Sequence, residues 1–325
     1  MTGVARADAI ERAVAVLRAG GLVAFPTETV YGLGADASNA RAVARIFAAK
    51  GRPADHPVIV HLAEAGQLPQ WARSVPEAAR RLAAAFWPGP LTLILPRAAG
   101  VLDVVTGGQD SVGIRVPSHP VAQALLRAFG GGIAAPSANR FGRISPTRAE
   151  HVRAELGDAV DLVLEGEAPA VGIESAIVDL SGARPALLRP GMLGAAALEA
   201  VLGEPLGAPG ADAPRASGTL AAHYAPRTPL RLVAAGALER ELAAAGAGVA
   251  VLARRAAPPG ARALAWRVAP PDAGGYAHDL YASLRELDAA GASCILVEAP
   301  PEGPQWAAVR DRLARAAAGA GVPLP

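Results

Sequence analysis

Residues 22–34 read Leu-Val-Ala-Phe-Pro-Thr-Glu-Thr-Val-Tyr-Gly-Leu-Gly, a short apolar run followed by a loop rich in hydroxyls and glycines. The apolar run has the length of a buried strand, and it follows a helical pattern that ends at Gly20 and Gly21. Ligand contacts in α/β sheets concentrate in loops that follow strands, so this loop is a candidate site. It contains neither a Gly-Lys-Ser/Thr sequence nor a strand-to-helix G-x-G-x-x-G, so any nucleotide would bind by another device.

The same alternation of strand and helix patterns continues through the first 200 residues. Several neighbouring strand patterns have no helix between them, which predicts a mixed sheet. Residues 204–229 then become rich in Gly, Pro, Ala and Ser without periodicity, and a second strand–helix alternation follows. We therefore predict a larger α/β domain over residues 1–203, a linker over residues 204–229, and a small doubly wound, Rossmann-like α/β domain over residues 230–325.

The bulk composition favours an ordered protein and gives no general attraction to nucleic acid or membrane. The 325 residues are 52% hydrophobic and carry a formal net charge of +2. No run reaches the ~18 uncharged apolar residues of a membrane helix, and the N-terminal stretch lacks the layout of a signal peptide. The single cysteine, Cys294, excludes an internal disulfide and a metal cluster built on thiolates. We expect a cytoplasmic protein.

One lysine stands out among the arginines of this sequence. Of 31 basic residues only Lys50 is a lysine, and it lies in a Lys-Gly-Arg-Pro sequence at the end of a helical pattern. An ammonium is a compact point charge whereas a guanidinium is a planar fork, so the two differ as partners of a phosphate. The alternative is a cation that only complements the helix dipole. The residues alone leave both interpretations open.

Two further polar side chains lie where ligand contacts are expected. Asn139 is one of only two asparagines and closes a Pro-Ser-Ala-Asn turn after a strand, where it either contacts a ligand or satisfies its own backbone. The other asparagine, Asn39, has the setting of a helix N-cap. Arg115 lies inside an apolar strand and needs an anion there, either a ligand carboxylate or an internal acid such as Asp110.

Six segments, taken together and in this order, resemble the YrdC-like domain family. They are residues 22–34, 50–62 (Lys-Gly-Arg-Pro-Ala-Asp-His-Pro-Val-Ile-Val-His-Leu), 87–92 (Trp-Pro-Gly-Pro-Leu-Thr), 115–117 (Arg-Val-Pro), 136–139 (Pro-Ser-Ala-Asn) and 188–191 (Leu-Arg-Pro-Gly). The resemblance spans about residues 8–203 without a break. His-Tyr-Ala-Pro at 223–226 and Leu-Tyr-Ala-Ser-Leu-Arg at 280–285 resemble the longer, two-domain form of the family.

This resemblance implies a fold and an activity. The fold would be a YrdC-like twisted mixed sheet with flanking helices, followed by a linker that covers the active site and by the small domain. The activity would be synthesis of threonylcarbamoyl-AMP and pyrophosphate from ATP, L-threonine and bicarbonate, for the tRNA modification N6-threonylcarbamoyladenosine. Mg²⁺ would enter with ATP and bind through its phosphates, without a protein metal site. The product would pass to the tRNA threonylcarbamoyl transferase machinery, with a weak direct tRNA contact as a further expectation.

The resemblance also implies roles for individual residues. Lys50 and Arg52 would be the catalytic pair that neutralises phosphate charge. The implied ATP-binding residues are Lys50, Arg52, Ser111, Ser137, Asn139, Ser145, Arg189 and Tyr224. The implied threonine-binding residues are Thr27, His61, Arg115 and Ser175, with Arg115 on the carboxylate of the amino acid.

Two other functions share parts of this pattern. A carbamoyl-adenylating module of the hydrogenase-maturation type has the same kind of domain, but it belongs to longer chains with zinc-finger cysteines, and a single cysteine excludes it. An RNA-binding protein without enzymatic activity would need a basic concave surface with stacking aromatic rings. A net charge of +2 and an aromatic content of 4% argue against that alternative.

Overall fold

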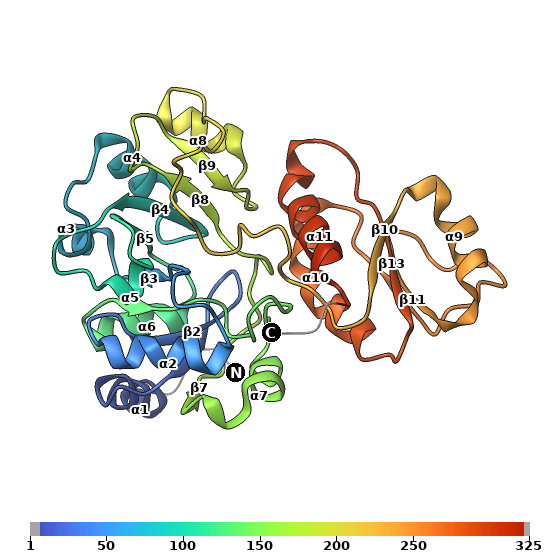
Figure 1. The fold of residues 1–325 in the computed structure, drawn as a ribbon, viewed down its shortest axis with the longest axis horizontal. Helices are drawn as coiled ribbons and strands as arrows, with labels where there is room; N and C mark the ends of the chain where they lie inside the picture. The colour runs from blue at the N-terminus through green and yellow to red at the C-terminus, as the bar shows by residue number, and fades with distance from the viewer. Residues whose placement is uncertain (1–6, 322–325) are drawn as a thin grey trace. The chain divides into compact units, whose positions relative to one another are not determined.

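The computed structural model describes residues 7–321 and divides the chain into two compact units (Figure 1). Unit 1 comprises the residues up to 140 together with residues 146–219. Unit 2 comprises residues 141–145 and the chain from residue 220 onward. The predicted linker, residues 204–229, is therefore shared between the units at Thr219.

Unit 1 is built on one nine-stranded mixed sheet, in the order β7-β1-β2-β6-β3-β5-β4-β8-β9. Its strands are β1 (Val23–Pro26), β2 (Tyr31–Asp36), β3 (Ile59–His61), β4 (Leu91–Pro96), β5 (Ser111–Arg115), β6 (Ile133–Ala134), β7 (Leu162–Val163), β8 (Ala176–Asp179) and β9 (Ala186–Arg189). The β1–β7, β3–β5 and β4–β8 pairs are parallel and the others antiparallel. The predicted mixed sheet is confirmed.

The helices of unit 1 cover the two faces of this sheet unequally. They are α1 (Ala7–Arg18), α2 (Ala40–Lys50), α3 (Leu68–Trp71), α4 (Glu77–Phe86), α5 (Asp103–Thr106), α6 (Pro120–Phe129), α7 (Ala149–Leu156) and α8 (Ala195–Leu202). Apolar residues of α2, α4, α7 and α8 belong to the main core on one face, whereas α1 and α6 pack on the other face over β1 and β6. On that second face, the stretch formed by β3, β5, β4 and β8 has no packed helix in the described core clusters.

Alternation along the strands gives this uncovered stretch its side chains. In β5, Val112 and Ile114 are buried in the main core, so the alternate residues Ser111, Gly113 and Arg115 face the opposite side. The same alternation in β3 and β4 places Ile59, His61, Thr92 and Ile94 beside them, because Val60, Leu91, Leu93 and Leu95 belong to the main core. We call this surface of β3, β5, β4 and β8 the polar face.

The end of α2 shows why two predicted site residues lie side by side. Asn39 caps the helix, because its Oδ1 accepts hydrogen bonds from the amides of residues 41 and 42. Gly51 ends the helix with φ at +60°, a conformation that glycine adopts without strain. Lys50 and Arg52 therefore flank the turn in which the helix stops, and the N-cap prediction for Asn39 is confirmed.

Unit 2 is a small parallel α/β domain with strand order β10-β13-β11-β12. Its strands are β10 (Leu230–Val233), β11 (Val249–Ala253), β12 (Ala265–Val268) and β13 (Cys294–Glu298), and its helices are α9 (Leu238–Ala245), α10 (Ala273–Asp288) and α11 (Ala307–Gly319). Helix α9 lies on one face of the sheet and α10 and α11 on the other (Figure 1). The predicted doubly wound domain is confirmed. None of the helices described between residues 7 and 321 has both the length and the apolar character needed to cross a membrane.

Candidate active site

The structure brings three of the four predicted threonine-binding residues together. His61 of β3 and Arg115 of β5 are register partners in the parallel β3–β5 pair. Arg115 Nη1 donates to Thr29 Oγ1 at 2.8 Å, and Thr29 Oγ1 lies 2.8 Å from Thr27 Oγ1. Arg115 Nε also donates to the carbonyl of Gly89 at 3.3 Å. The hydroxyl-rich loop that begins at Thr27 thus meets the polar face at Arg115.

Arg115 has an internal carboxylate partner, and it is Glu28. Arg115 Nη2 lies 2.6 Å from Glu28 Oε1, and the two side chains are only 5% and 8% exposed. Glu28 Oε2 accepts a second hydrogen bond, at 3.0 Å, from the amide of Ser118. Asp110, the acid considered from the sequence, is instead 90% exposed and lies 3.7 Å from Arg97. The open alternative of an internal acid is thus met by Glu28, and Asp110, the example named for it, is wrong.

His61 contributes a buried polar atom to the same corner. Its ring packs edge-on against Phe25, with 6.2 Å between centroids. Burial, and then the nearby Arg115 charge, lower the pKa of His61 to about 3, so the imidazole is neutral at physiological pH. Its Nδ1 has no hydrogen-bond partner among residues 7–321. A neutral ring with an unused nitrogen beside a buried arginine suits a polar ligand group.

Lys50 ties the end of α2 to the Pro-Ser-Ala-Asn turn. Its Nζ donates to the carbonyls of Ser137 and Asn139, each at 2.5 Å. The Asn139 side chain is buried and donates to the carbonyl of Arg140 at 2.7 Å. Burial, followed by repulsion from Arg52, lowers the pKa of Lys50 to about 7. Lys50, Ser137 and Asn139 thus lie together, joined by hydrogen bonds from the ammonium to backbone carbonyls, and their role at the phosphates stays a prediction.

The two arginines predicted to bind ATP, Arg52 and Arg189, hold the linker. Arg52 Nη2 donates to Ser217 Oγ at 3.3 Å, and Arg189 Nη1 donates to the carbonyl of Ser217 at 2.7 Å. Arg189 also bonds Ser175 twice, through Nε to its carbonyl at 3.0 Å and through Nη2 to its Oγ at 3.1 Å. Ser175 Oγ lies 2.8 Å from Thr92 Oγ1. Ser175, the fourth residue predicted to bind threonine, is therefore hydrogen-bonded to Arg189, which is predicted to bind ATP.

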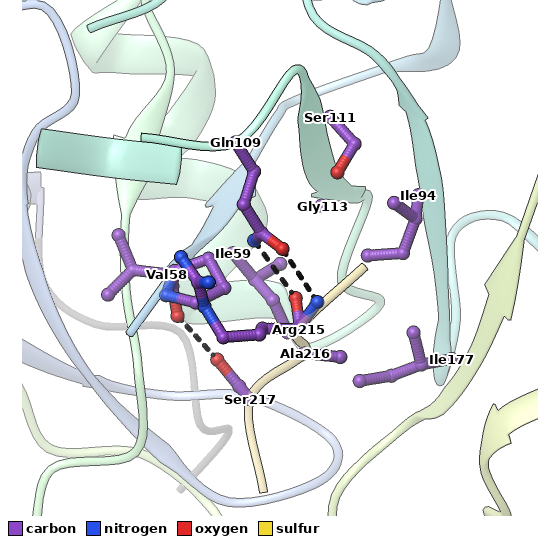
Figure 2. Close-up of a pocket in the computed structure, with 11 residues that line it drawn as sticks. Val58, Ile59, Ile94, Gln109, Ser111, Gly113, Ile177, Arg215, Ala216 and Ser217 are labelled. Carbon is purple, nitrogen blue, oxygen red and sulfur yellow. Dashed lines mark hydrogen bonds between the residues drawn. The ribbon is translucent and has the colours of Figure 1, made fainter. Parts of the chain in front are cut away.

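Residues 215–217 of the linker lie over the polar face. A cavity of about 10 Å³ is left there, room for about one water molecule. Its lining residues are Pro57, Val58, Ile59, Ile94, Gln109, Ser111, Gly113, Ile177, Arg215, Ala216 and Ser217 (Figure 2). Ala216 packs against Ile94, Ile177 and Leu188. Residues 215–217 therefore cover the polar face beside Ser111.

The side chain of Gln109 fastens the linker at this point. Its Nε2 donates to the carbonyl of Arg215 at 3.2 Å, and its Oε1 accepts from the amide of Arg215 at 2.6 Å (Figure 2). The Arg215 side chain donates in turn to the carbonyl of Gly107 at 2.8 Å. Sequence reasoning missed Gln109 and Ser217. It also missed Glu28 and Thr29, although the hydroxyl-rich loop that contains them was singled out.

Ser145 and Tyr224, two predicted ATP-binding residues, belong to unit 2. The Ser145 carbonyl accepts a hydrogen bond of 3.5 Å from Arg285 Nε. Tyr224 is buried, with its ring 4.2 Å from that of His223 and the Arg312 guanidinium 5.2 Å from its centroid. Among the described residues it is the only non-glycine with a positive φ, at 60°. Such a conformation persists only where the surroundings impose it.

The comparisons with known proteins cover almost the whole chain. The Sua5–YciO–YrdC family profile, described as telomere recombination, matches residues 15–191. A profile described as threonylcarbamoyl-AMP synthase, C-terminal domain, matches residues 193–318. A threonylcarbamoyl-AMP synthase of Pyrococcus abyssi is 39% identical over 94% of this chain and 93% of its own length. One of Bacillus subtilis is 45% identical over 71% of this chain and 68% of its own length.

Solved structures agree with these matches. P. abyssi Sua5 complexed with L-threonine has a TM-score of 0.88 at 39% identity, over 95% of this chain and 94% of that chain. Thermococcus kodakarensis HypF reaches a TM-score of 0.50 at 19% identity, over 57% of this chain and 24% of that chain, and shares the fold alone. Because one profile matches more than half of the chain and a relative matches nearly all of it, this chain belongs to the Sua5/YrdC family in its two-domain form.

Proposed function

We propose that this protein is a threonylcarbamoyl-AMP synthase, which condenses L-threonine, bicarbonate and ATP to threonylcarbamoyl-AMP and pyrophosphate. The observation that carries the proposal is the relationship over nearly the full length to enzymes of that name. A related structure that contains L-threonine adds support on the side of the amino acid. These relatives favour the enzyme over the alternative of an RNA-binding protein without activity.

The amino-acid half of the reaction would use the corner around Arg115. Its guanidinium would take the threonine carboxylate, while the hydroxyls of Thr27 and Ser175 and the neutral ring of His61 supply uncharged polar contacts. The amine of threonine and bicarbonate would combine to a carbamate and water. Holding the carbamate in one orientation makes the following step effectively unimolecular. Serving as a rigid binding surface is thus the main role of these side chains.

The nucleotide half would use the cations around Ser217. A carbamate oxygen would attack the α-phosphate of ATP in line and expel pyrophosphate, so that no covalent intermediate with the enzyme forms. Lys50 and Arg52 would neutralise the phosphate charge that develops, with Arg189 close by. ATP phosphates would therefore replace Ser217 as the partner of the two arginines. Asn139, Ser137 and Ser111 would complete the contacts in unit 1.

Mg²⁺ would accompany ATP in this proposal. Among residues 7–321 no group of three or more His, Cys, Asp or Glu side chains is arranged to hold a metal ion. Mg²⁺ commonly binds through substrate phosphates and water, with few protein ligands. The ion would supply charge neutralisation at the phosphates, and the side chains of Lys50 and Arg52 would add to it.

The linker would serve as a lid in this reaction. Residues 215–217 lie on the polar face and contact Arg52 and Arg189, so in this proposal the segment would leave before ATP binds. Its return over both substrates would exclude water from an adenylate that hydrolyses readily. The domain scheme that goes with this role is a catalytic domain over residues 1–203, the lid over residues 204–229 and a small domain over residues 230–325.

Further steps of the pathway belong to the same proposal. The labile product would pass in the cytoplasm to the tRNA threonylcarbamoyl transferase machinery, which completes N6-threonylcarbamoyladenosine. A weak direct contact with tRNA is part of this expectation. Both follow from the family resemblance and not from a particular surface of this chain.

A single incubation tests the proposed activity. The protein is mixed with ATP, MgCl₂, L-threonine and ¹³C-bicarbonate, and the products are separated and weighed by mass spectrometry. We expect a labelled threonylcarbamoyl-adenylate and an equal amount of pyrophosphate. Omission of threonine is the matched control and should remove both products. Failure to form adenylate or pyrophosphate with all substrates present would refute the synthase assignment.

A further inference from the structure

We infer that Glu28 recognises the α-ammonium group of the amino-acid substrate, beside the Arg115 that takes its carboxylate. This inference rests on the proposed function, and it assigns a specificity-determining role to a side chain outside the predicted site residues. It starts from a buried ion pair that lies at the substrate corner and not in the hydrophobic core.

The guanidinium nitrogens of Arg115 are all engaged in hydrogen bonds within the chain. Each of its three nitrogens has a partner within the chain, at Thr29 Oγ1, at Glu28 Oε1 and at the Gly89 carbonyl. Only one of these partners, Glu28, is charged. A substrate carboxylate that reaches Arg115 therefore arrives next to the carboxylate of Glu28, in a place where both side chains of the pair are almost fully buried.

Charge balance then selects what can bind. A simple carboxylate would place two negative groups against one guanidinium, and like charges at short range are strongly unfavourable away from water. An α-amino acid carries its ammonium about 2.5 Å from its carboxyl carbon. It therefore brings a positive charge along with the second negative one. Two carboxylates, one guanidinium and one ammonium form a neutral arrangement, in which Glu28 is the counter-ion of the ammonium.

The fixed position of Glu28 supports this role. Its Oε2 accepts from the Ser118 amide at 3.0 Å, and its own carbonyl accepts from the Val171 amide at 2.8 Å. Both ends of the residue are thus held by backbone groups. The adjacent His61 leaves one buried nitrogen without a partner among the described residues, which independently indicates a polar ligand at this corner. Because His61 is neutral, it adds no positive charge that could replace the ammonium.

The inference predicts a selectivity that a structural ion pair would not produce. L-Threonine should bind far better than 2,3-dihydroxybutanoate, the analogue whose ammonium is replaced by a hydroxyl group. In the Glu28→Gln variant, threonine should bind at least about tenfold more weakly. The hydroxy acid should bind as well as before or better, because the repelling carboxylate is gone. The preference for the amine should therefore fall by at least about tenfold.

Isothermal titration of the full chain with each ligand measures these affinities. Thr29→Val is the matched control, because it removes the uncharged partner of the same guanidinium and should weaken both ligands in similar proportion. Glu28→Asp keeps the charge and should keep most of the preference. ATP binding, measured on the same samples, reports whether unit 1 is folded. An unchanged preference in folded Glu28→Gln protein would make Glu28 a structural partner of Arg115 only.

Wild-type protein provides a second measurement that needs no variant. Threoninol retains the ammonium and lacks the carboxylate, so it should bind better than the hydroxy acid if Glu28 acts as inferred. A hydroxy acid that binds within about threefold of threonine would overturn the inference even if Glu28→Gln failed to fold. If wild-type protein neither binds threonine nor makes adenylate, the proposed function itself fails. If it does both while the preference is unaffected by Glu28, the inference alone fails.

Discussion

The two halves of the candidate site hold their cations in different ways. On the amino-acid side, Arg115 is fixed by a buried carboxylate, a hydroxyl and a carbonyl that all come from ordered strands and short loops. On the nucleotide side, Arg52 and Arg189 share Ser217, which belongs to a long segment without regular structure. The cation of the first half is thus held by ordered parts of the chain, whereas the two arginines of the second half are held in part by an irregular segment.

Substitutions in the two halves should therefore change different properties of the protein. Truncation within the amino-acid half removes one side of a buried charge pair, so stability and threonine affinity should fall together. Changes in the nucleotide half should spare most of the stability, because its contacts are made largely to backbone carbonyls and to a segment without regular structure. They should instead alter turnover, proton uptake and access to the site.

Arg115→Ala should give the largest effect. It leaves Glu28 buried beside the Ser118 amide alone, and breaking a buried pair in this way typically costs about 3–5 kcal/mol of unfolding free energy. The threonine requirement should also rise at least about tenfold, while ATP binding changes far less. Urea denaturation measures the first effect and calorimetry with each substrate the second.

The Arg115→Met, Glu28→Gln double variant separates the two effects. It removes both charges, so most of the lost stability should return, but threonine binding should not. Equal losses of threonine and ATP affinity in Arg115→Ala would mean that the arginine is structural. The two halves of the site would then not bind separate substrates.

Lys50→Ala should reduce pyrophosphate release by roughly 10²–10³-fold while the fold is retained, since a positioned charge at the phosphates is removed. Lys50→Arg should restore only part of the activity, because a planar fork does not replace a point charge. Pyrophosphate release with saturating substrates measures both. Wild-type turnover in either variant would contradict a role for Lys50 at the phosphates.

The contrast between Lys50 and Arg115 also shows what the sequence could predict. The scarcity of lysine and the presence of an arginine in an apolar strand pointed to both residues, and hydrophobic alternation predicted the mixed sheet and the small parallel domain. The partner of Arg115 was not predictable in this way. Asp110 is close in sequence, but Glu28 is 87 residues away and reaches Arg115 only because β3, β5 and the first loop meet in space.

The contacts of the linker could not be predicted from the sequence either. Gln109 bonds the backbone of a residue 106 positions away, and a backbone group leaves no trace in the pattern of side chains. Composition indicated that residues 204–229 form an irregular segment. It could not indicate that Ala216 would be buried on the polar face, because a small residue in a Gly/Pro-rich stretch has no periodicity to reveal burial.

The pKa of Lys50 gives a pH-dependent prediction for the nucleotide half. Burial lowers it from 10.5 to about 7, so between these values the unfolded chain binds more protons than the folded one. The contribution of Lys50 to stability therefore becomes more favourable as pH rises from about 7 towards 10.5. ATP phosphates favour the protonated amine, so ATP binding at pH 8 should take up close to one proton.

Calorimetry of ATP binding in two buffers with different ionisation enthalpies measures this uptake. Lys50→Met is the control and should show a much smaller difference between the buffers. Equal binding enthalpies in both buffers for the wild type would contradict a neutral Lys50 in the free protein. The amino-acid half should show no comparable uptake through His61, because its pKa of about 3 keeps it neutral at this pH.

Gln109→Ala should give the smallest effect, and it tests whether the nucleotide half is closed by a fastened lid. The substitution removes two hydrogen bonds to the backbone of Arg215 without touching a predicted substrate contact. Each such bond contributes about 0.5–1.5 kcal/mol net, so the lid should open several-fold more often while global stability changes little.

Limited proteolysis within residues 204–219 should therefore be several-fold faster in the variant than in the wild type. ATP and threonine together should slow cleavage in both proteins, since the lid would close over bound substrates. Glu302→Ala is the control, because it alters an exposed side chain of unit 2 and should leave the cleavage rate unchanged. Gln67→Ala would not serve, because Gln67 caps a turn. If Gln109→Ala is cut at the wild-type rate and ligands do not protect either protein, residues 204–219 are a passive tether, and the two halves of the site differ only in their charges.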